Sequence, residues 1–266
     1  MVRRIFRINL LQGFLYPTTG FKRLLAAWLV LPVSLAVLVP PILLGLGLKT
    51  STSVQGIPLT LTIFAVCVLV GSLPFTCLAG YLLRCRKQVM QGRSQLPPWT
   101  GLRALLKDGG GMDMLGIWFA TPAIGLVALA LTSLAGTIGN FSNHHTWGAF
   151  FIALFGSGAG LLCLLLALIY WIFVLLVSPM ATLRLALGAT PLQAVSLKGI
   201  VQDIGRGFGD YLLCCVLVWG VSVLFQMAQA AFWPLVLVTF PAQVYLQLVW
   251  AHLLGQYALA YLPERL

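Results

Sequence analysis

The polar side chains with the widest chemical scope lie in the last apolar hairpin of the sequence. They are five glutamines and one histidine, Gln226, Gln229, Gln243, Gln247, His252 and Gln256. Gln243 and Gln247 share one face of a helix, while His252 and Gln256 share nearly the opposite face. Polar groups in lipid need partners, so we expect this helix to lie centrally in a bundle. His252 would line a polar cavity, ligate a tetrapyrrole, or simply hydrogen-bond to neighbouring helices, which is the interpretation we favour.

No set of residues in the sequence has the spacing of a catalytic or metal centre. All five acidic residues lie outside the apolar runs, whereas a proton or cation relay places carboxylates inside them. Zinc-protease, serine-hydrolase and P-loop patterns are absent from the sequence. The pair His144-His145 has no Cys, Asp or Glu beside it, and the six cysteines follow no ligand spacing. The sequence therefore predicts no catalytic residue, no metal ligand, no bound cofactor and no enzyme activity.

The composition indicates that lipid surrounds most of the elements that hold these residues. Apolar residues make up 60% of the sequence and charged residues 8%, against roughly 45–50% and about 25% in soluble domains. A soluble fold of this length could not hide so much apolar surface. The net charge of +11 comes from short basic blocks beside the apolar runs, a pattern typical of membrane-flanking loops. Nucleic acid is therefore not an expected partner.

Six apolar runs have the length to cross a bilayer, which takes about 20 residues of helix. None of the six contains Lys, Arg, Asp or Glu. The predicted spans are residues 24–48, 57–83, 114–135, 147–177, 211–231 and 234–261. The predicted fold is therefore all-α, a polytopic bundle of six transmembrane helices that forms a single integral membrane domain over residues 1–266.

The basic residues predict the orientation of this bundle. With six spans, both termini share a side with the loops 84–113 and 178–210. That side holds all of the sixteen Lys and Arg residues except Lys49. The positive-inside rule then predicts that both termini lie in the cytoplasm, with the protein in the inner or plasma membrane of the cell.

The two cytoplasmic loops carry helical periodicity of their own. The Thr-Pro-Leu-Gln sequence at 190–193 has the spacing of a capping box, and the residues that follow predict an amphipathic helix as far as Arg206. The segment 99–107 has a similar pattern, and the N-terminal stretch is a fainter third case. Such helices lie in the headgroup layer of a membrane.

The joins between these helices and the spans also resemble each other. Asp113 and Asp210 each follow an aspartate and a glycine-containing turn, at the expected start of a span. We expect both to satisfy free amide groups at the positive end of the helix dipole. The pattern predicts three repeated units, each an interfacial helix followed by a hairpin.

The basic residues of the two loops form a predicted interfacial collar. Its members are Arg84, Arg86, Lys87, Arg93, Arg103, Lys107, Arg184, Lys198 and Arg206. The collar either binds anionic lipid headgroups or a cytosolic partner, or only anchors the hairpins at the interface. We favour the interpretation that the collar only anchors the hairpins, because it requires no specific ligand.

Four stretches of the chain resemble a known family. They are "YPTTGFKRLL" at 16–25, "GYLLRCRKQVMQGRSQLPPW" at 80–99, "SPMATLRLALGATPLQAV" at 178–195 and "HLLGQY" at 252–257. These stretches are similar to domain-of-unknown-function family 4013, which groups polytopic membrane proteins of bacteria and archaea. The resemblance implies a membrane bundle but no activity. The loops are similar to those of cyanobacterial members, for which the thylakoid membrane is the alternative location.

The sequence favours one function over its rivals. We expect a non-enzymatic membrane component that organises lipids or partner proteins through the collar, with anionic headgroups, a membrane-protein partner or a second copy of the chain as ligands. The alternative is a permease for a small or amphiphilic solute that uses the Gln and His residues of the last hairpin. Ion-coupled transport is disfavoured because no carboxylate lies inside a span.

Overall fold

The computed structural model describes residues 8–30, 32–34, 36–37, 57–93, 95–143 and 147–265. Every regular element within these ranges is helical. The chain divides into two compact units, one made of Met1–Asp113 with Thr182–Leu266 and the other of Met114–Ala181. The predicted all-α fold is confirmed for the described residues.

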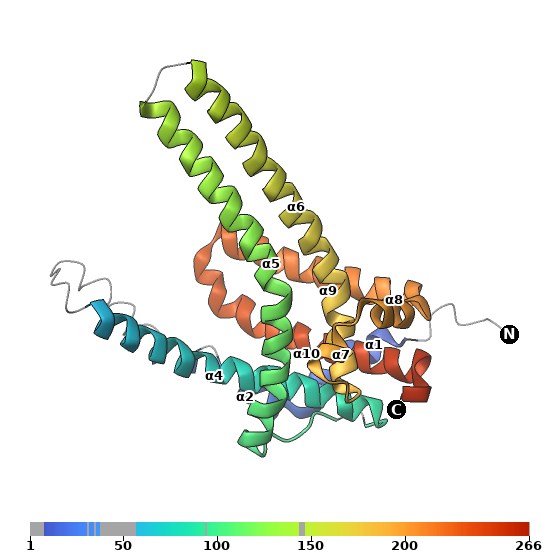
Figure 1. The fold of residues 1–266 in the computed structure, drawn as a ribbon. Coiled ribbons are helices and arrows are strands. Elements are labelled where there is room, and N and C mark those ends of the chain that lie inside the picture. The colour runs from blue at the N-terminus through green and yellow to red at the C-terminus, as the bar shows by residue number, and fades with distance from the viewer. Residues whose placement is uncertain are drawn as a thin grey trace. The chain divides into compact units, whose positions relative to one another are not determined.

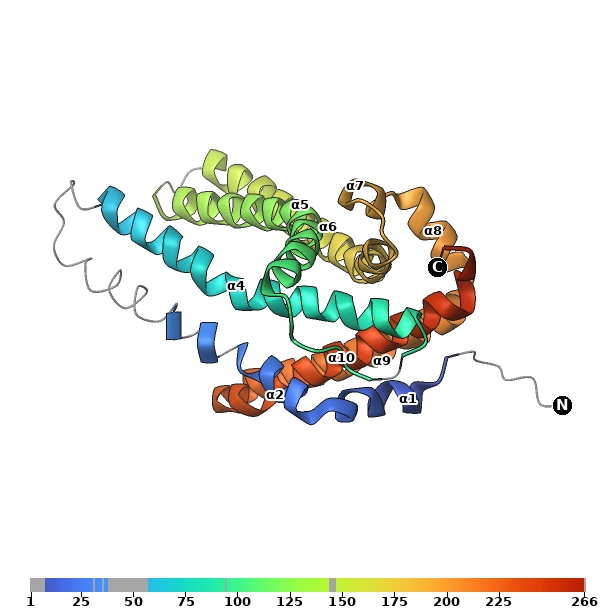
Figure 2. The same ribbon diagram turned by 90° about the horizontal axis from the view of Figure 1, so that it is seen from below.

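The second unit is a hairpin formed by the greater part of two long helices, α5 (Leu102–Asn143) and α6 (Trp147–Ala186), whose outer ends at residues 102–113 and 182–186 belong to the first unit. The two helices run side by side in Figures 1 and 2. Ser133 Oγ donates a hydrogen bond of 2.7 Å to the carbonyl of Gly156. A Cβ at Gly160 would lie 2.9 Å from Leu134 Cγ. Small residues therefore let the two helices approach closely, as is usual for helices in lipid.

The first unit is arranged around its last helix, α10 (Val236–Tyr261). This helix packs against α4 (Ile57–Met90), α9 (Phe208–Ala231), α1 (Leu10–Leu15) and α2 (Phe21–Trp28). Figure 2 shows α1 alongside α10, so segments from the two ends of the chain lie together. The central position expected for this helix is what the unit shows.

The core of the first unit joins residues that are distant in the sequence. Buried residues of α4, α10 and the N-terminal segment pack together, among them Tyr16, Tyr81, Cys85, Leu248 and Ala251. The short helix η1 (Tyr16–Gly20) supplies the first of these.

Two glycines set how closely α5 approaches α4. A Cβ at Gly80 would lie 2.0 Å from the carbonyl oxygen of Leu105, and one at Gly109 would lie 1.8 Å from that of Thr76. Thr76 Oγ1 also donates a hydrogen bond of 2.5 Å to Asp113 Oδ2. The first turns of α5 are therefore held against α4, backbone to backbone.

Four described helices have the length and hydropathy of membrane spans: Val66–Met90, Leu102–Ala135, Gly156–Ala186 and Phe208–Ala231. They correspond to four of the six predicted spans. Most of the predicted span 24–48 lies outside the described residues. The predicted span 234–261 is helical throughout most of its length, as α10, but is not among the four. His144-His145 also lies outside the described residues.

Helices extend into both of the predicted loops. Most of the predicted loop 84–113 is helical, because α4 continues to Met90 and α5 begins at Leu102. The basic residues at 84–87 therefore lie on the last turns of a helix. The segment 99–107 is largely the beginning of α5 rather than a separate helix, and for this reason Asp113 lies inside α5 instead of at a helix start.

The second loop contains two short helices instead of one. α6 ends at Ala186, and α7 (Pro191–Ala194) is followed by α8 (Leu197–Gly205). The predicted capping box is confirmed at the start of α7. The break comes at Ser196, whose backbone is extended and whose carbonyl accepts a 3.0 Å hydrogen bond from Arg184 Nη1. The same carbonyl also accepts a 3.0 Å hydrogen bond from the N–H of Ile200, so Ser196 is the residue at which α8 begins and its extended backbone separates α7 from α8.

Candidate functional site

The loop that follows α4 is fixed against the helix by aromatic and polar contacts. The ring of Trp99 stacks on that of Tyr81, with 4.1 Å between centroids and 14° between planes. Tyr81 donates a 3.0 Å hydrogen bond to the carbonyl of Pro97, and Trp99 Nε1 donates one of 3.0 Å to that of Arg23. Arg23 in turn donates to the carbonyl of Leu96. This loop is therefore a rigid support for the basic residues beside it.

A single carboxylate near the end of α4 serves two cations. Asp108 Oδ1 lies 3.5 Å from Lys87 Nζ, and Asp108 Oδ2 lies 3.8 Å from Arg84 Nε. Arg84 also donates to the carbonyls of Thr100 and Gly101. Because one negative charge faces two positive charges, the cluster keeps a net positive charge.

A second carboxylate, fully buried, also serves two cations. Asp203 of α8 is 0% exposed, and its Oδ2 accepts a 2.7 Å hydrogen bond from Arg265 Nη1. Arg184 Nε, near the end of α6, lies 3.5 Å from the same oxygen. We call Arg184, Asp203 and Arg265 the carboxylate clasp, because they join the end of α6, α8 and the residues after α10.

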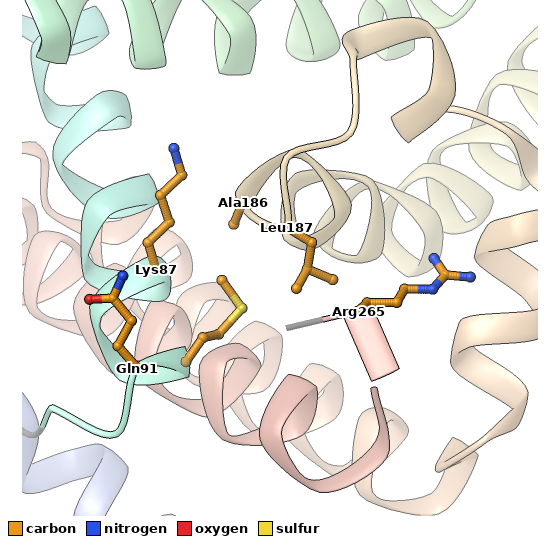
Figure 3. A pocket seen from close by; sticks show the side chains of 6 residues that line it. Lys87, Gln91, Ala186, Leu187 and Arg265 are labelled. Atoms are coloured by element: carbon orange, nitrogen blue, oxygen red, sulfur yellow. The ribbon is translucent and has the colours of Figure 1, made fainter. Parts of the chain in front are cut away.

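A pocket of about 230 Å³ lies between these two clusters, and we call it the basic pocket. It is lined by Lys87, Met90, Gln91, Ala186, Leu187 and Arg265. Figure 3 shows Lys87 and Gln91 on one side and Arg265 on the other, with Leu187 between them. The pocket lies where two apolar helices end, at Met90 and Ala186, which is headgroup depth if both helices span a bilayer.

The charges around the basic pocket favour an anion. Both of the cations that line it, Lys87 and Arg265, share a carboxylate with a second cation. Neither is neutralised by a carboxylate of its own. Lys and Arg are also the usual ligands of phosphate groups in proteins. The geometry therefore suits a phosphate or another compact anion.

A neighbouring pocket of about 230 Å³ continues the basic surface along α4. Arg84, Lys87 and Arg93 line it together with the loop after α4. Lys87 therefore borders both pockets. The two pockets form one basic surface around the end of α4.

Arg86 occupies a different position from its neighbours. Its side chain is 3% exposed, and its Nη1 lies 3.6 Å from Met112 Sδ. Within the described residues it has no carboxylate at ion-pair distance. Its charge therefore adds to the positive potential at the end of α4, where fixed charges act over several ångströms.

The other predicted collar residues lie on the surface. Arg103, Lys107 and Lys198 are exposed, and Arg206 pairs with Glu264, which follows α10. Of the nine, Arg84, Lys87 and Arg93 line the two basic pockets, Arg86 is buried, and Arg184 belongs to the carboxylate clasp.

The polar residues of the last hairpin do not form one cluster. Gln226 and Gln247 are exposed, while Gln229 and Gln243 are half-buried. Gln256 pairs with the backbone of Asn9. This leaves His252 as the buried member of the set.

The sequence did not indicate the partners that complete these sites. Arg265 and Leu187 of the basic pocket, and the Asp203 of the clasp, lie far from Lys87 in the chain. The N-terminal residues Asn9 and Tyr16 lie beside the last helix. The only signal was indirect: Asp203 is one of just five acidic residues in a strongly basic chain.

Comparison with known proteins gives a family and nothing more specific. A family model described as "Protein of unknown function (DUF4013)" matches residues 60–233, which is more than half of the chain. No curated protein matches the chain. No solved structure matches it.

Proposed function

The chain belongs to the DUF4013 family of proteins of unknown function, and we propose that it is a multi-pass membrane protein that binds anionic lipid headgroups at the basic pocket. The role is non-enzymatic: the protein organises lipid, and through lipid its neighbours, at the cytoplasmic surface. The observation that carries the proposal is the pairing in this pocket, where both lining cations share their carboxylates with other cations. A phosphodiester would neutralise the surplus charge.

The position of the N-terminal segment supports a first membrane crossing before α4. Arg23 is hydrogen-bonded to Trp99, which stacks on Tyr81. α4 begins at Ile57, and the distance from Tyr81 back to Ile57 along the helix axis is about 36 Å at 1.5 Å per residue. That distance exceeds the roughly 30 Å of a bilayer core. The chain between Arg23 and Ile57 has to cover it, as a span would.

The contacts at the end of α10 support a last crossing. Arg206, just before α9, pairs with Glu264, just after α10. Tyr261 donates a 2.7 Å hydrogen bond to Asp210 in the first turn of α9. α9 is 24 residues long, about 36 Å at 1.5 Å per residue. The chain therefore leaves along α9 and returns along α10, which supports six spans.

Six spans with this charge distribution place both termini and the basic pocket in the cytoplasm. The inner leaflet is also where anionic lipids attract basic residues, by about 1 kcal/mol for each Lys or Arg near the surface. The membrane is the bacterial inner or plasma membrane, with the thylakoid as the alternative for a cyanobacterial chain. A membrane-protein partner or a second copy of the chain would bind alongside the lipid.

A permease is less well supported. It would use the Gln and His residues of the last hairpin together, but Gln226 and Gln247 are exposed while His252 is buried. These residues do not surround a common polar passage in the described part of the chain. Lipid binding needs only the pocket that the structure contains.

The proposal is tested by titrating the purified protein in mild detergent with short-chain phosphatidylglycerol. Phosphatidylcholine and inorganic phosphate are titrated in parallel. The variant Lys87→Gln/Arg265→Gln removes both lining cations, and we expect its Kd for phosphatidylglycerol to rise about 30-fold, at about 1 kcal/mol for each lost charge. Lys87→Gln alone, which leaves the carboxylate clasp intact, should raise it about fivefold.

The matched control is Arg103→Gln/Lys107→Gln, which removes two exposed cations of the same collar. We expect it to change the Kd less than threefold, because charges in water are screened. Equal affinity for phosphatidylcholine, or an equal loss in the control, would show that the pocket is not the site. Competition by inorganic phosphate at the same concentration would identify free phosphate as the ligand instead.

A further inference from the structure

A second kind of cavity lies where the N-terminal segment packs on α10. It has a volume of about 270 Å³ and is lined by Asn9, Leu11, Leu15 and Tyr16 on one side and by His252 on the other. Gln12 and Thr19 complete the lining, so that no Lys, Arg, Asp or Glu contributes to it. We call it the histidine cavity. It shares no lining residue with the basic pocket.

His252 is the unusual member of this lining. The side chain is 2% exposed, and neither Nδ1 nor Nε2 has a hydrogen-bond partner among the described residues. Its ring lies against that of Tyr16, with 4.4 Å between centroids. A buried polar atom without a partner costs about 1–3 kcal/mol. A ligand in the cavity would therefore supply the hydrogen bond that the described residues do not give to this imidazole.

The wall of the cavity opposite His252 is held in place by its own contacts. The N–H of Asn9 donates a 2.7 Å hydrogen bond to Gln256 Oε1, and Gln256 Nε2 donates one of 3.3 Å to the carbonyl of Asn9. Tyr245 donates to the carbonyl of Phe14. A Cβ at Gly13 would lie 2.6 Å from Leu253 Cδ2. α1 therefore sits closely on α10, and the cavity is a formed site rather than a gap.

The groups around the cavity select a neutral ligand. Burial raises the pKa of Tyr16 well above its ordinary range, so its phenol stays protonated. The imidazole has no carboxylate in the lining to offset the cost of a buried charge, so it stays neutral as well. A charged headgroup would lose its water without gaining a counter-ion there.

The residues at the rim of the cavity favour a ligand that has a hydrocarbon portion. Leu11 is 69% exposed and Leu15 is 54% exposed, on a helix that precedes the first predicted span. Exposed leucines at that position face lipid rather than water if the chain spans the membrane. A ligand would therefore place a small polar head beside His252 and its hydrocarbon over the two leucines.

We propose that the histidine cavity binds a neutral lipid with a free hydroxyl, of the diacylglycerol class. A neutral imidazole offers one N–H donor and one nitrogen acceptor, and a hydroxyl group can serve either of them. The ester-linked chains leave the cavity over Leu11 and Leu15. This site is independent of the anionic lipid site, because the two pockets share no lining residue and one suits an anion while the other suits a neutral ligand.

The test is a calorimetric titration of the full chain in detergent with 1,2-dioctanoylglycerol. The same lipid with its hydroxyl acetylated is the matched probe, because it keeps the chains and loses the donor. We expect the acetylated probe to bind about tenfold more weakly, as the loss of one buried hydrogen bond implies. His252→Phe, which keeps an aromatic ring beside Tyr16, should weaken dioctanoylglycerol by about the same factor.

Two further variants keep the result interpretable. Leu15→Trp fills the mouth of the cavity and leaves His252 unchanged, and it should abolish binding if the ligand enters there. Gln226→Leu alters an exposed polar residue outside the cavity and should change the Kd less than twofold. If His252→Phe does not fold, Leu15→Trp and the acetylated probe still decide the question.

The proposal is overturned if dioctanoylglycerol does not bind, or if the acetylated lipid binds equally well. It is also overturned if a short-chain benzoquinone or phosphatidylglycerol displaces dioctanoylglycerol, binds with higher affinity than dioctanoylglycerol, and loses that binding in the Leu15→Trp variant. Failure here leaves the basic pocket untouched, since Lys87→Gln/Arg265→Gln is the variant that tests that site.

Discussion

The basic pocket and the histidine cavity are two sites of similar size that differ in how their polar groups are paired. In the basic pocket, Lys87 and Arg265 each have a carboxylate partner, but each partner is shared. The lining of the histidine cavity contains no charged residue, and neither ring nitrogen of His252 has a hydrogen-bond partner among the described residues. The comparison teaches that one helix bundle can offer surplus positive charge in one pocket and an unpaired hydrogen-bonding group in another.

The largest effect should come from breaking the carboxylate clasp. Asp203→Asn removes the negative charge that Arg184 and Arg265 share, and Asp203 is fully buried. Loss of one member of a buried ion pair costs about 3–5 kcal/mol. We expect the free energy of unfolding in detergent to fall by that order, as measured by denaturant titration.

The matched control for that change is Glu264→Gln. Glu264 also pairs with an arginine, but its side chain is 61% exposed. An exposed ion pair contributes about 0–1 kcal/mol. Equal losses in the two variants would contradict the distinction between a buried clasp and a surface pair.

A smaller effect should follow from a methyl group between α4 and α5. A Cβ at Gly109 would lie 1.8 Å from the carbonyl oxygen of Thr76, whereas one at Gly110 would meet nothing within 4 Å. Gly109→Ala should therefore destabilise the chain by about 1–3 kcal/mol and displace Asp108 from Lys87. Gly110→Ala should be neutral or stabilise the helix by up to about 1 kcal/mol.

The comparison of the two sites predicts which ligand each glycine variant affects. Binding of phosphatidylglycerol should weaken in Gly109→Ala, while binding of dioctanoylglycerol should persist because the histidine cavity has no residue from α5. Calorimetric titration of both lipids against both variants measures this. A parallel loss of the two affinities would mean that the sites are coupled through the fold.

The smallest expected effect is the change of the two lipid Kd values with salt concentration. Raising the ionic strength from about 0.05 M to about 0.5 M shortens the Debye length severalfold. The Kd for phosphatidylglycerol should then rise by about tenfold, since that binding rests on charge. The Kd for dioctanoylglycerol should stay within about twofold, and a salt response there would indicate a charged group that the cavity lining does not contain.

The sequence predicted the helices better than the sites, and the reasons are physical. Long apolar runs and a capping box act within a few residues, so the spans at 57–83, 114–135, 147–177 and 211–231 and the start of α7 are readable from local pattern. Helices extend into the predicted cytoplasmic loops because a helix continues past its last apolar residue while hydrogen bonds and packing hold it. The six-span count and the repeated units stay predictions.

Site residues were harder to predict because they depend on distant partners. All nine collar residues carry the same charge, yet only Asp108 and Asp203 decide which of them are clustered. The six polar residues of the last hairpin look alike in the sequence, but packing of α1 on α10 singles out His252 and Gln256. Pattern within one helix carries no information about which other segment covers it.

The carboxylate clasp also bears on the order in which the protein can mature during synthesis. Lys87 and Asp108 leave the ribosome early, while Arg265 is translated after α9 and α10. Until then Asp203 has Arg184 as its only partner in the clasp, and the pocket lacks one wall. If the basic pocket binds headgroups as proposed, a chain that still lacks Arg265 has only the Lys87 cation to hold the anion and should retain the lipid more weakly.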